Sequence, residues 1–183
     1  MWWWLKSLAV GAGVGLVVGV SVGGTLGRVF MRILFLARED TLGLQTAMGA
    51  VIGDFTSDGT TTIYGFGAIA GVALGLAYTA GRALLPSGTR ARTIFFTLGT
   101  TAFMVGQIVR GNREDFAMLP VTLSLVLIIG SVALTAAPVP LLIERFAPDR
   151  KRSPGRLSQG VVLLGMSGFA AYAVTGIGLA YAI

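Results

Sequence analysis

Long apolar runs, separated by short polar segments, divide the chain into about five helices. The runs are about 20 residues or longer, the length of helix that crosses the ~30 Å hydrocarbon core of a bilayer. The pattern predicts transmembrane helices over residues of about 8–37, 63–85, 93–109, 118–143 and 159–181. The expected fold class is therefore an all-α membrane protein, a compact bundle forming one transmembrane domain over residues 1–183.

Three segments should depart from a simple bundle. The first helix is long enough to project past the bilayer or to bend along its surface. The third is short, so whether it spans fully stays open. Pro138 and Pro140 lie near the end of the fourth, which should kink or unwind there because proline lacks an amide donor. Clustered Gly, Asp, Ser and Thr predict an ordered outer loop of about 25 residues, 38–62, after helix one.

The charged residues predict an orientation, because loops that face the cytoplasm carry an excess of Lys and Arg. With five spans, the amino terminus shares one side with the second and fourth loops. That side holds most of the basic residues: Lys6, Arg82, Arg90, Arg92, Arg145, Arg150, Lys151, Arg152 and Arg156. Most acidic residues fall on the other side: Glu39, Asp40, Asp54, Asp58, Glu114 and Asp115. We therefore expect a multi-pass protein of a bacterial plasma membrane, with the amino terminus in the cytoplasm and the carboxy terminus outside.

The composition agrees with a membrane protein and narrows its chemistry. Hydrophobic residues make up 54% of the chain and charged residues only 12%, whereas a soluble domain carries about 25% charge. The chain has 0 Cys and 0 His, which removes thiolate metal sites, His ligands and His general bases. We expect no cofactor and, since no basic stretch is interleaved with aromatic residues, no nucleic-acid partner.

Glycine forms the strongest pattern in the sequence. It recurs every four residues in the first helix and again in the second: Gly11, Gly15, Gly19, Gly23 and Gly27, then Gly67, Gly71 and Gly75. Such rows leave a groove that lets another helix backbone approach closely. The simplest interpretation is that helices one and two pack together within one chain; the alternative is glycine-mediated packing between subunits.

A cluster of charges is expected at the outer end of the bundle. Its members are Arg28, Arg32, Asp54, Asp58, Arg110, Arg113, Glu114 and Asp115. The first two share a helix face because they are four residues apart. They either extend to lipid headgroups or form an anion-attracting or salt-bridging site with the acids of the facing loops.

Three further features have an ordinary structural interpretation. The sequence DFTSDGT begins at Asp54 like a calcium loop, but the twelfth position is Gly65 and not an acid, so a tight turn fits better and a cation site stays an alternative. The turn RGNREDF, 110–116, pairs acids with bases but offers no nucleophile, which argues against catalysis. Gln107, the one strongly polar residue inside a predicted span, should hydrogen-bond to a neighbouring helix.

Two short motifs carry a resemblance. GAVIGDFTSDGT, residues 49–60, precedes a glycine-rich helix, and NREDF, residues 112–116, follows in a later turn. With them the chain resembles a group of bacterial polytopic membrane proteins of four to five helices, over most of its length. The resemblance implies a multi-pass helical protein and no activity, since none is assigned to that group.

The functional prediction follows from glycine grooves, the lack of an acid inside any predicted span and the lack of cofactor ligands. We expect a non-enzymatic integral membrane subunit, an accessory or assembly component of a larger complex or a homo-oligomer. Its partners would be membrane lipids and other membrane subunits or copies of itself. The alternative is a small channel or transporter whose charged vestibule faces away from the cytoplasm.

Overall fold

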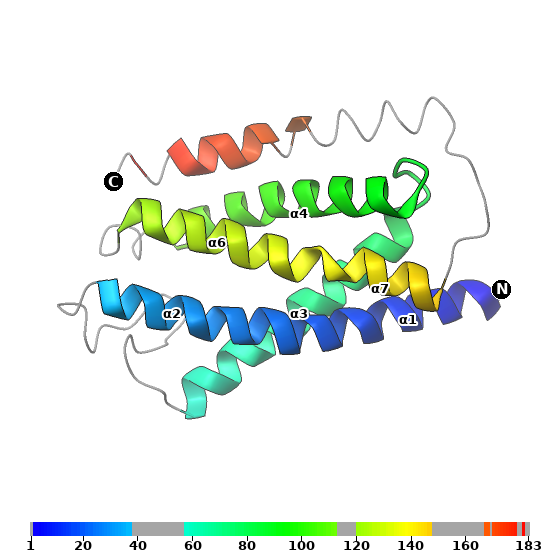
Figure 1. Ribbon diagram of the computed structural model, residues 1–183, viewed down its shortest axis with the longest axis horizontal. Helices are drawn as coiled ribbons and strands as arrows, with labels where there is room; N and C mark the ends of the chain where they lie inside the picture. The colour runs from blue at the N-terminus through cyan, green and yellow to red at the C-terminus, as the bar shows by residue number, and fades with distance from the viewer. Residues whose placement is uncertain are drawn as a thin grey trace.

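The computed structural model describes residues 2–37, 57–112, 120–147, 167–168, 170–178 and 181. The regular elements in this part of the chain are all helices (Figure 1). Four of them are long and apolar enough to cross a membrane: Trp4–Ala37, Ser57–Gly81, Thr89–Gly111 and Val121–Phe146. The prediction of an all-α chain is confirmed for the described residues, and the four apolar helices suggest a multi-pass membrane protein.

The first helix is continuous but changes its winding halfway. It consists of α1 (Trp2–Val18), the π-helical segment η1 (Gly19–Gly24) and α2 (Thr25–Ala37). At 1.5 Å per residue, its 34-residue apolar stretch is about 50 Å long, well beyond the ~30 Å core of a bilayer. The π-helical turns, which often mark functional or strained positions, lie where this helix packs on α3.

Helix α3 spans Ser57–Gly81, so it begins six residues earlier than the predicted start at 63. The reason is local hydrogen bonding. The hydroxyl of Thr61 donates to the carbonyl of Ser57 at 3.0 Å, and that of Thr62 to Asp58 at 2.9 Å. These polar side chains are satisfied by the helix itself, whereas hydropathy assigns them to the outer loop. The predicted loop of residues 38–62 is therefore wrong over 57–62, and its remainder lies outside the described residues.

Helix α4 spans Thr89–Gly111 and is longer than predicted. It follows Gly88, whose φ of +100° is readily available only to glycine. With 23 residues, α4 is about 35 Å long, enough to cross a bilayer. Hydropathy missed the first turn because Arg90 and Arg92 lie in it.

Helices α6 (Val121–Ala136) and α7 (Pro138–Phe146) form one rod with a single interruption at Ala137. Ala137 keeps helical dihedrals, φ −63° and ψ −40°, and its amide donates to the Ala133 carbonyl at 3.0 Å. The helix does not unwind at the prolines, and the interruption falls directly before Pro138, where the sequence predicts a kink or unwinding. Pro138 lacks an amide hydrogen and therefore interrupts the hydrogen bonding between α6 and α7. The rod also runs past the predicted end at 143, which brings Glu144 into a helix.

The helices pack side by side, with α1 against α3, α4 against α6, and α7 against α1, α3 and α4. Figure 1 shows α3 crossing behind the first helix and the carboxy-terminal helical segment, residues 170–178, beside α4. That segment falls within the predicted fifth helix, whose other residues lie largely outside the described part. Only 22–28% of the residues in the four apolar stretches are buried. Large apolar side chains such as Val17, Ile69 and Val126 point outward, as in a protein surrounded by lipid.

Candidate functional site

The glycines of the first helix face those of α3 at backbone contact. A Cβ atom on Gly15 would lie 2.1 Å from the carbonyl oxygen of Gly71, and one on Gly19 would lie 2.0 Å from that of Gly67. A Cβ on Gly75 would lie 1.9 Å from the oxygen of Gly11. Carbon atoms do not approach oxygen this closely, so no residue larger than glycine fits without moving a helix. The structure thus brings these six glycines together within one chain.

The last two glycines of the predicted row first meet side chains and not backbone. A Cβ on Gly23 would first meet Cγ2 of Thr135 at 3.4 Å, an ordinary contact distance. A Cβ on Gly27 would meet Cγ2 of Ile63 at 2.8 Å, a tight contact with a side chain whose χ1 is restricted in a helix. The contact with α3 passes from Gly19 to the buried Gly24, whose amide nitrogen would lie 3.1 Å from a Cβ on Gly67, because the π-helical turns shift the register of the helix face.

At the end of the bundle where the chain begins, a charged group is buried between three helices. Nη1 of Arg92 on α4 donates to Oε1 of Glu144 on α7 at 3.0 Å, and the two side chains are only 9% and 11% exposed. The hydroxyl of Tyr78 on α3 donates to the same oxygen at 2.7 Å. Nε of Arg92 donates to the Pro86 carbonyl at 3.2 Å. The carboxylate of Glu144 thereby connects α3, α4 and α7.

A second arginine extends this connection to α1. Arg82 follows α3 directly and is 3% exposed. Its Nη1 donates to the Ala147 carbonyl, just after α7, at 2.6 Å, and its Nη2 contacts Oγ of the buried Ser7 on α1 at 3.4 Å. We call Ser7, Tyr78, Arg82, Arg92 and Glu144 the inner polar cluster. It links the same end of α1, α3, α4 and α7.

Sequence reasoning missed the inner polar cluster for identifiable reasons. Arg82 and Arg92 were interpreted as loop charges that set orientation, and Glu144 fell one residue beyond the predicted helix. The statement that no acid lies inside a span is wrong for the observed helices, since Glu144 lies in α7 and Asp58 in the first turn of α3. One signal was available: Tyr78 and Arg82 are four residues apart and therefore share a helix face.

The outer charged residues do not form one site in the described part of the chain. Arg28 on α2 donates from Nη2 to the hydroxyl of Thr60 on α3. Arg32 is exposed, with its guanidinium carbon 5.0 Å from the centre of the Phe35 ring. Asp58 is exposed beside Ser57.

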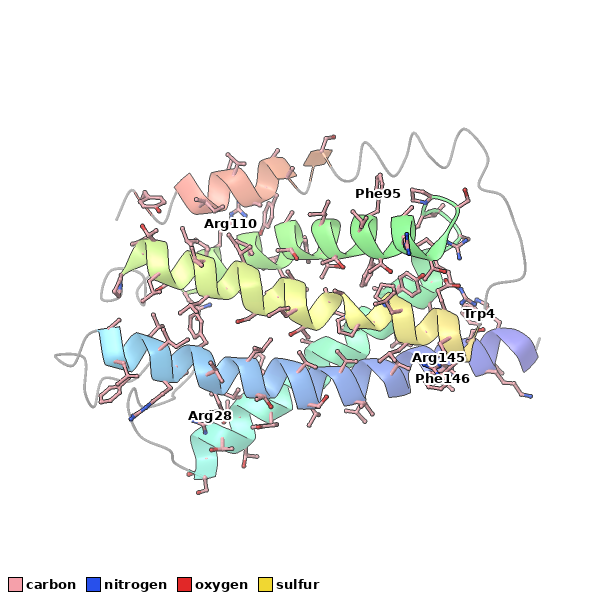
Figure 2. The ribbon with its side chains drawn as sticks, in the orientation of Figure 1. Trp4, Arg28, Phe95, Arg110, Arg145 and Phe146 are labelled. Carbon is pink, nitrogen blue, oxygen red and sulfur yellow. The ribbon has the colours of Figure 1, made fainter. Side chains whose placement is uncertain are left out.

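Of the other members of the predicted outer cluster, the structure describes only Arg110. Arg110 lies apart from Arg28, between α4 and residues 170–178 (Figure 2). Asp54, Arg113, Glu114 and Asp115 lie outside the described residues. The same holds for Asp54 of the possible calcium loop, while its Asp58 and Gly59 belong to α3. Within the described residues, no group of three or more Asp, Glu, His or Cys side chains could hold a metal ion.

Gln107 is exposed on α4. It makes no hydrogen bond to any neighbouring helix that the structure describes. A hydrogen bond from Gln107 to a neighbouring helix therefore stays a prediction. The Gln107 amide points toward whatever surrounds the protein.

A shallow hollow of about 140 Å³ opens between α2 and α6. Leu26, Val29 and Phe30 line it from one side, and Val126, Gly130 and Leu134 from the other. Ser131 is the one polar residue of the lining. The hollow therefore suits an apolar chain and offers little to a polar solute.

Comparison with known proteins gives no relative for this arrangement. No protein-family model, curated sequence or solved structure matches the chain. The functional argument therefore depends on the chain's own residues.

Proposed function

We propose that this chain is a non-enzymatic, multi-pass protein of a bacterial plasma membrane, an accessory or assembly subunit of a larger membrane complex or of a homo-oligomer. Two connections hold its helices together: the backbone contact of α1 with α3, and the inner polar cluster. In that cluster the hydroxyl of Tyr78 lies beside the carboxylate of Glu144, but Tyr78 is 0% exposed and therefore closed to a substrate. A bundle with fixed helix contacts suits a subunit that positions other chains of a complex.

The outward amide of Gln107 is the observation that carries the proposal. Gln107 lies four residues before the end of α4, about 6 Å along the helix axis. An amide that faces hydrocarbon without a partner costs several kcal/mol, about 2–7 depending on the reference. Glutamine side chains in membrane helices relieve this cost by hydrogen bonding across to another helix. Since no described helix of the chain supplies that partner, a second protein chain is the natural source.

The glycine rows favour the same conclusion by exclusion. Gly15, Gly19, Gly67 and Gly71 already lie against each other's backbone within the chain. These residues cannot also provide a close contact for another subunit. The subunit contact must therefore use an outward face, and the exposed Gln107 lies on such a face of α4.

Site-specific photo-cross-linking in native membranes tests the proposal. A photoreactive phenylalanine analogue replaces Gln107 in one variant and Ile69, which is 73% exposed on α3, in a matched control. We expect a discrete protein adduct at position 107 and none at 69. Blue-native electrophoresis of Gln107→Leu should then show the complex weakened about 3- to 30-fold, the range for one interhelical hydrogen bond of about 0.6–2 kcal/mol.

The contrary result is equally clear. If position 107 yields only lipid adducts and the wild-type chain migrates as a monomer in every mild detergent, the subunit role is refuted. An adduct at 69 equal to that at 107 would show random collision and would remove the argument from Gln107.

For the orientation, we propose that the inner polar cluster lies at the cytoplasmic end of the bundle. Ser7, Arg82 and Arg92 mark that end, which agrees with the excess of basic residues there. The hydroxyls of Tyr181 and Thr122 lie 3.1 Å apart at the opposite end, where α6 begins. This contact puts the two ends of the described chain at opposite ends of the bundle, and the excess of basic residues favours the amino-terminal end as the cytoplasmic one.

A small channel or transporter is the second candidate. The buried hydroxyls of Thr97 and Thr101 on α4 and Ser124 on α6 have no hydrogen-bond partner among the described residues, and unpaired polar groups can line a solute path. Flux measurements in liposomes test this candidate. Ion or solute flux that falls in Thr101→Val would favour transport, and no flux for any tested solute would remove it.

A further inference from the structure

Arg110 lies near the end of α4 with its guanidinium held on three sides. The guanidinium carbon lies 3.5 Å from the centre of the Tyr172 ring. Nη2 donates to the hydroxyl of Thr175 at 2.5 Å, and Nη1 to the carbonyl of Gly106 at 3.3 Å. Figure 2 shows the side chain in the contact between α4 and residues 170–178. A ring, a hydroxyl and a carbonyl therefore fix the plane of the guanidinium.

Two glycines make room for this arrangement. A Cβ on Gly106 would lie 2.5 Å from Cδ1 of Tyr172 and 3.1 Å from Nη1 of Arg110. A Cβ on Gly176 would lie 3.2 Å from Cα of Gly106 and 3.4 Å from the same Nη1. A larger residue at Gly106 would displace the Tyr172 ring and crowd the guanidinium, and one at Gly176 would press on the backbone of α4 at Gly106. The small residues thus serve the placement of Arg110 as well as the approach of the helices.

No neighbour that the structure describes neutralises the charge of Arg110. Both of its hydrogen-bond acceptors, a hydroxyl and a carbonyl, are neutral, and it makes no ion pair with any acid that the structure describes. A guanidinium has five N–H donors, so several remain for another ligand. Its planar fork matches the oxygens of a phosphate group and binds them more strongly than neutral acceptors. Stacking on an aromatic ring leaves that fork free at its edge.

We propose that Arg110, positioned by Tyr172 and Thr175, binds the phosphate group of an anionic phospholipid at the outer end of the bundle. The proposal rests on the membrane location in the proposed function, but not on the subunit role. At the end of a spanning helix an arginine reaches the headgroup layer. An anionic headgroup neutralises the unpaired charge, whereas a zwitterionic one brings its own cation. The site therefore prefers phosphatidylglycerol over phosphatidylcholine.

Native mass spectrometry of the full-length chain, released from mild detergent, tests the site with three probes. The probes are phosphatidylglycerol, phosphatidylcholine and inorganic phosphate, each titrated onto delipidated protein. We expect retained phosphatidylglycerol to exceed phosphatidylcholine, and this preference to fall about tenfold in Arg110→Gln, the loss of one charge-assisted interaction. Arg90→Gln is the matched control, because Arg90 lies on the same helix, is exposed and carries the same charge. It should keep the wild-type preference.

A conservative variant separates binding from folding. Arg110→Lys keeps the charge but lacks the planar fork, so it should fold as the wild type does by circular dichroism and show an intermediate preference. Equal retention of both lipids by the wild type would overturn the proposal, and so would equal losses in Arg110→Gln and Arg90→Gln. Retention of inorganic phosphate with the same dependence on Arg110 would overturn the lipid assignment. The assay counts lipids retained per chain whatever the oligomeric state, so a failure of the subunit role would not affect its result.

Discussion

Replacing Gly71 by alanine adds one methyl group where α3 meets the first helix. The new Cβ would lie 2.1 Å from the oxygen of Gly15 and 2.6 Å from Cα of Gly19. Carbon atoms prefer separations of about 3.5–4.0 Å. Both obstacles are backbone atoms, which no side-chain rotation can remove. We therefore expect α1 and α3 to separate by about 1 Å around this point.

The cost can be worked from two opposing terms. Overpacking a close contact costs typically 1–3 kcal/mol, and a rigid backbone obstacle places Gly71→Ala at about 3. Alanine favours the helix over glycine by about 1 kcal/mol. The free energy of unfolding should therefore fall by about 2 kcal/mol, or further if the neighbouring contacts at Gly67 and Gly75 open as well.

Gly13 provides the control on the first helix, since a Cβ there would meet nothing within 4 Å. Gly13→Ala should be neutral or gain up to about 1 kcal/mol from helix propensity. Titration of dodecylmaltoside-solubilised protein with sodium dodecyl sulfate, followed by circular dichroism, gives both free energies of unfolding. If Gly71→Ala proves as stable as Gly13→Ala, the backbone contact between α1 and α3 does not exist as described.

The same titration checks three further expectations. Arg92→Met should lower the free energy of unfolding by about 3–5 kcal/mol, because it leaves the carboxylate of Glu144 without its counterion. Adding Glu144→Leu should recover much of the loss. Simple addition of the two single effects would show that the pair is not coupled. Tyr78→Phe should cost about 1.5–3 kcal/mol, since a hydrogen bond to a charged group is lost, and wild-type stability would contradict the 2.7 Å bond. Gly19→Ala should lower the free energy of unfolding by about 2 kcal/mol or more. Gly23→Ala, whose Cβ would first meet an atom at 3.4 Å, should change it by less than about 0.5 kcal/mol. Equal effects would contradict the difference in backbone contact between the two positions.

Hydrophobic pattern predicted the helices well because lipid-facing and buried surfaces are both apolar, so each span forms one continuous run. The boundaries were poorer where polar residues belong to a helix. Thr61 and Thr62 satisfy their hydroxyls within α3, and Arg92 lies in the first turn of α4. A scale that measures transfer from water into lipid does not register such local hydrogen bonding.

The glycine rows show how much of the helix contact can be predicted from the spacing of glycines. A spacing of four residues correctly marked one face of each helix, but it extended the row through Gly23 and Gly27 as if the helix were uniform. The π-helical turns of η1 change the number of residues per turn, so the face that meets α3 passes from Gly19 to Gly24 and leaves Gly23 aside. Periodicity in the sequence contains no sign of that change.

Side-chain contacts between residues that are distant in sequence could not be predicted. Glu144 joins Tyr78 and Arg92 over separations of 66 and 52 residues, and Arg110 meets Thr175 over 65. Charged residues near the ends of the spans have two roles, since they set the orientation and also form pairs inside the bundle. Only the first role can be predicted from the sequence, because the second depends on which helices become neighbours.

Cysteine labelling in sided vesicles tests whether the bundle crosses a membrane in the proposed sense. The chain has 0 Cys, so Lys6→Cys and Tyr181→Cys each introduce a unique exposed thiol, one at each end. An impermeant maleimide should label position 181 in right-side-out vesicles and position 6 only in inverted ones. Labelling of both from the same side, or release of the chain from membranes by alkaline carbonate, would contradict a bundle that spans the bilayer with its inner polar cluster in the cytoplasmic half.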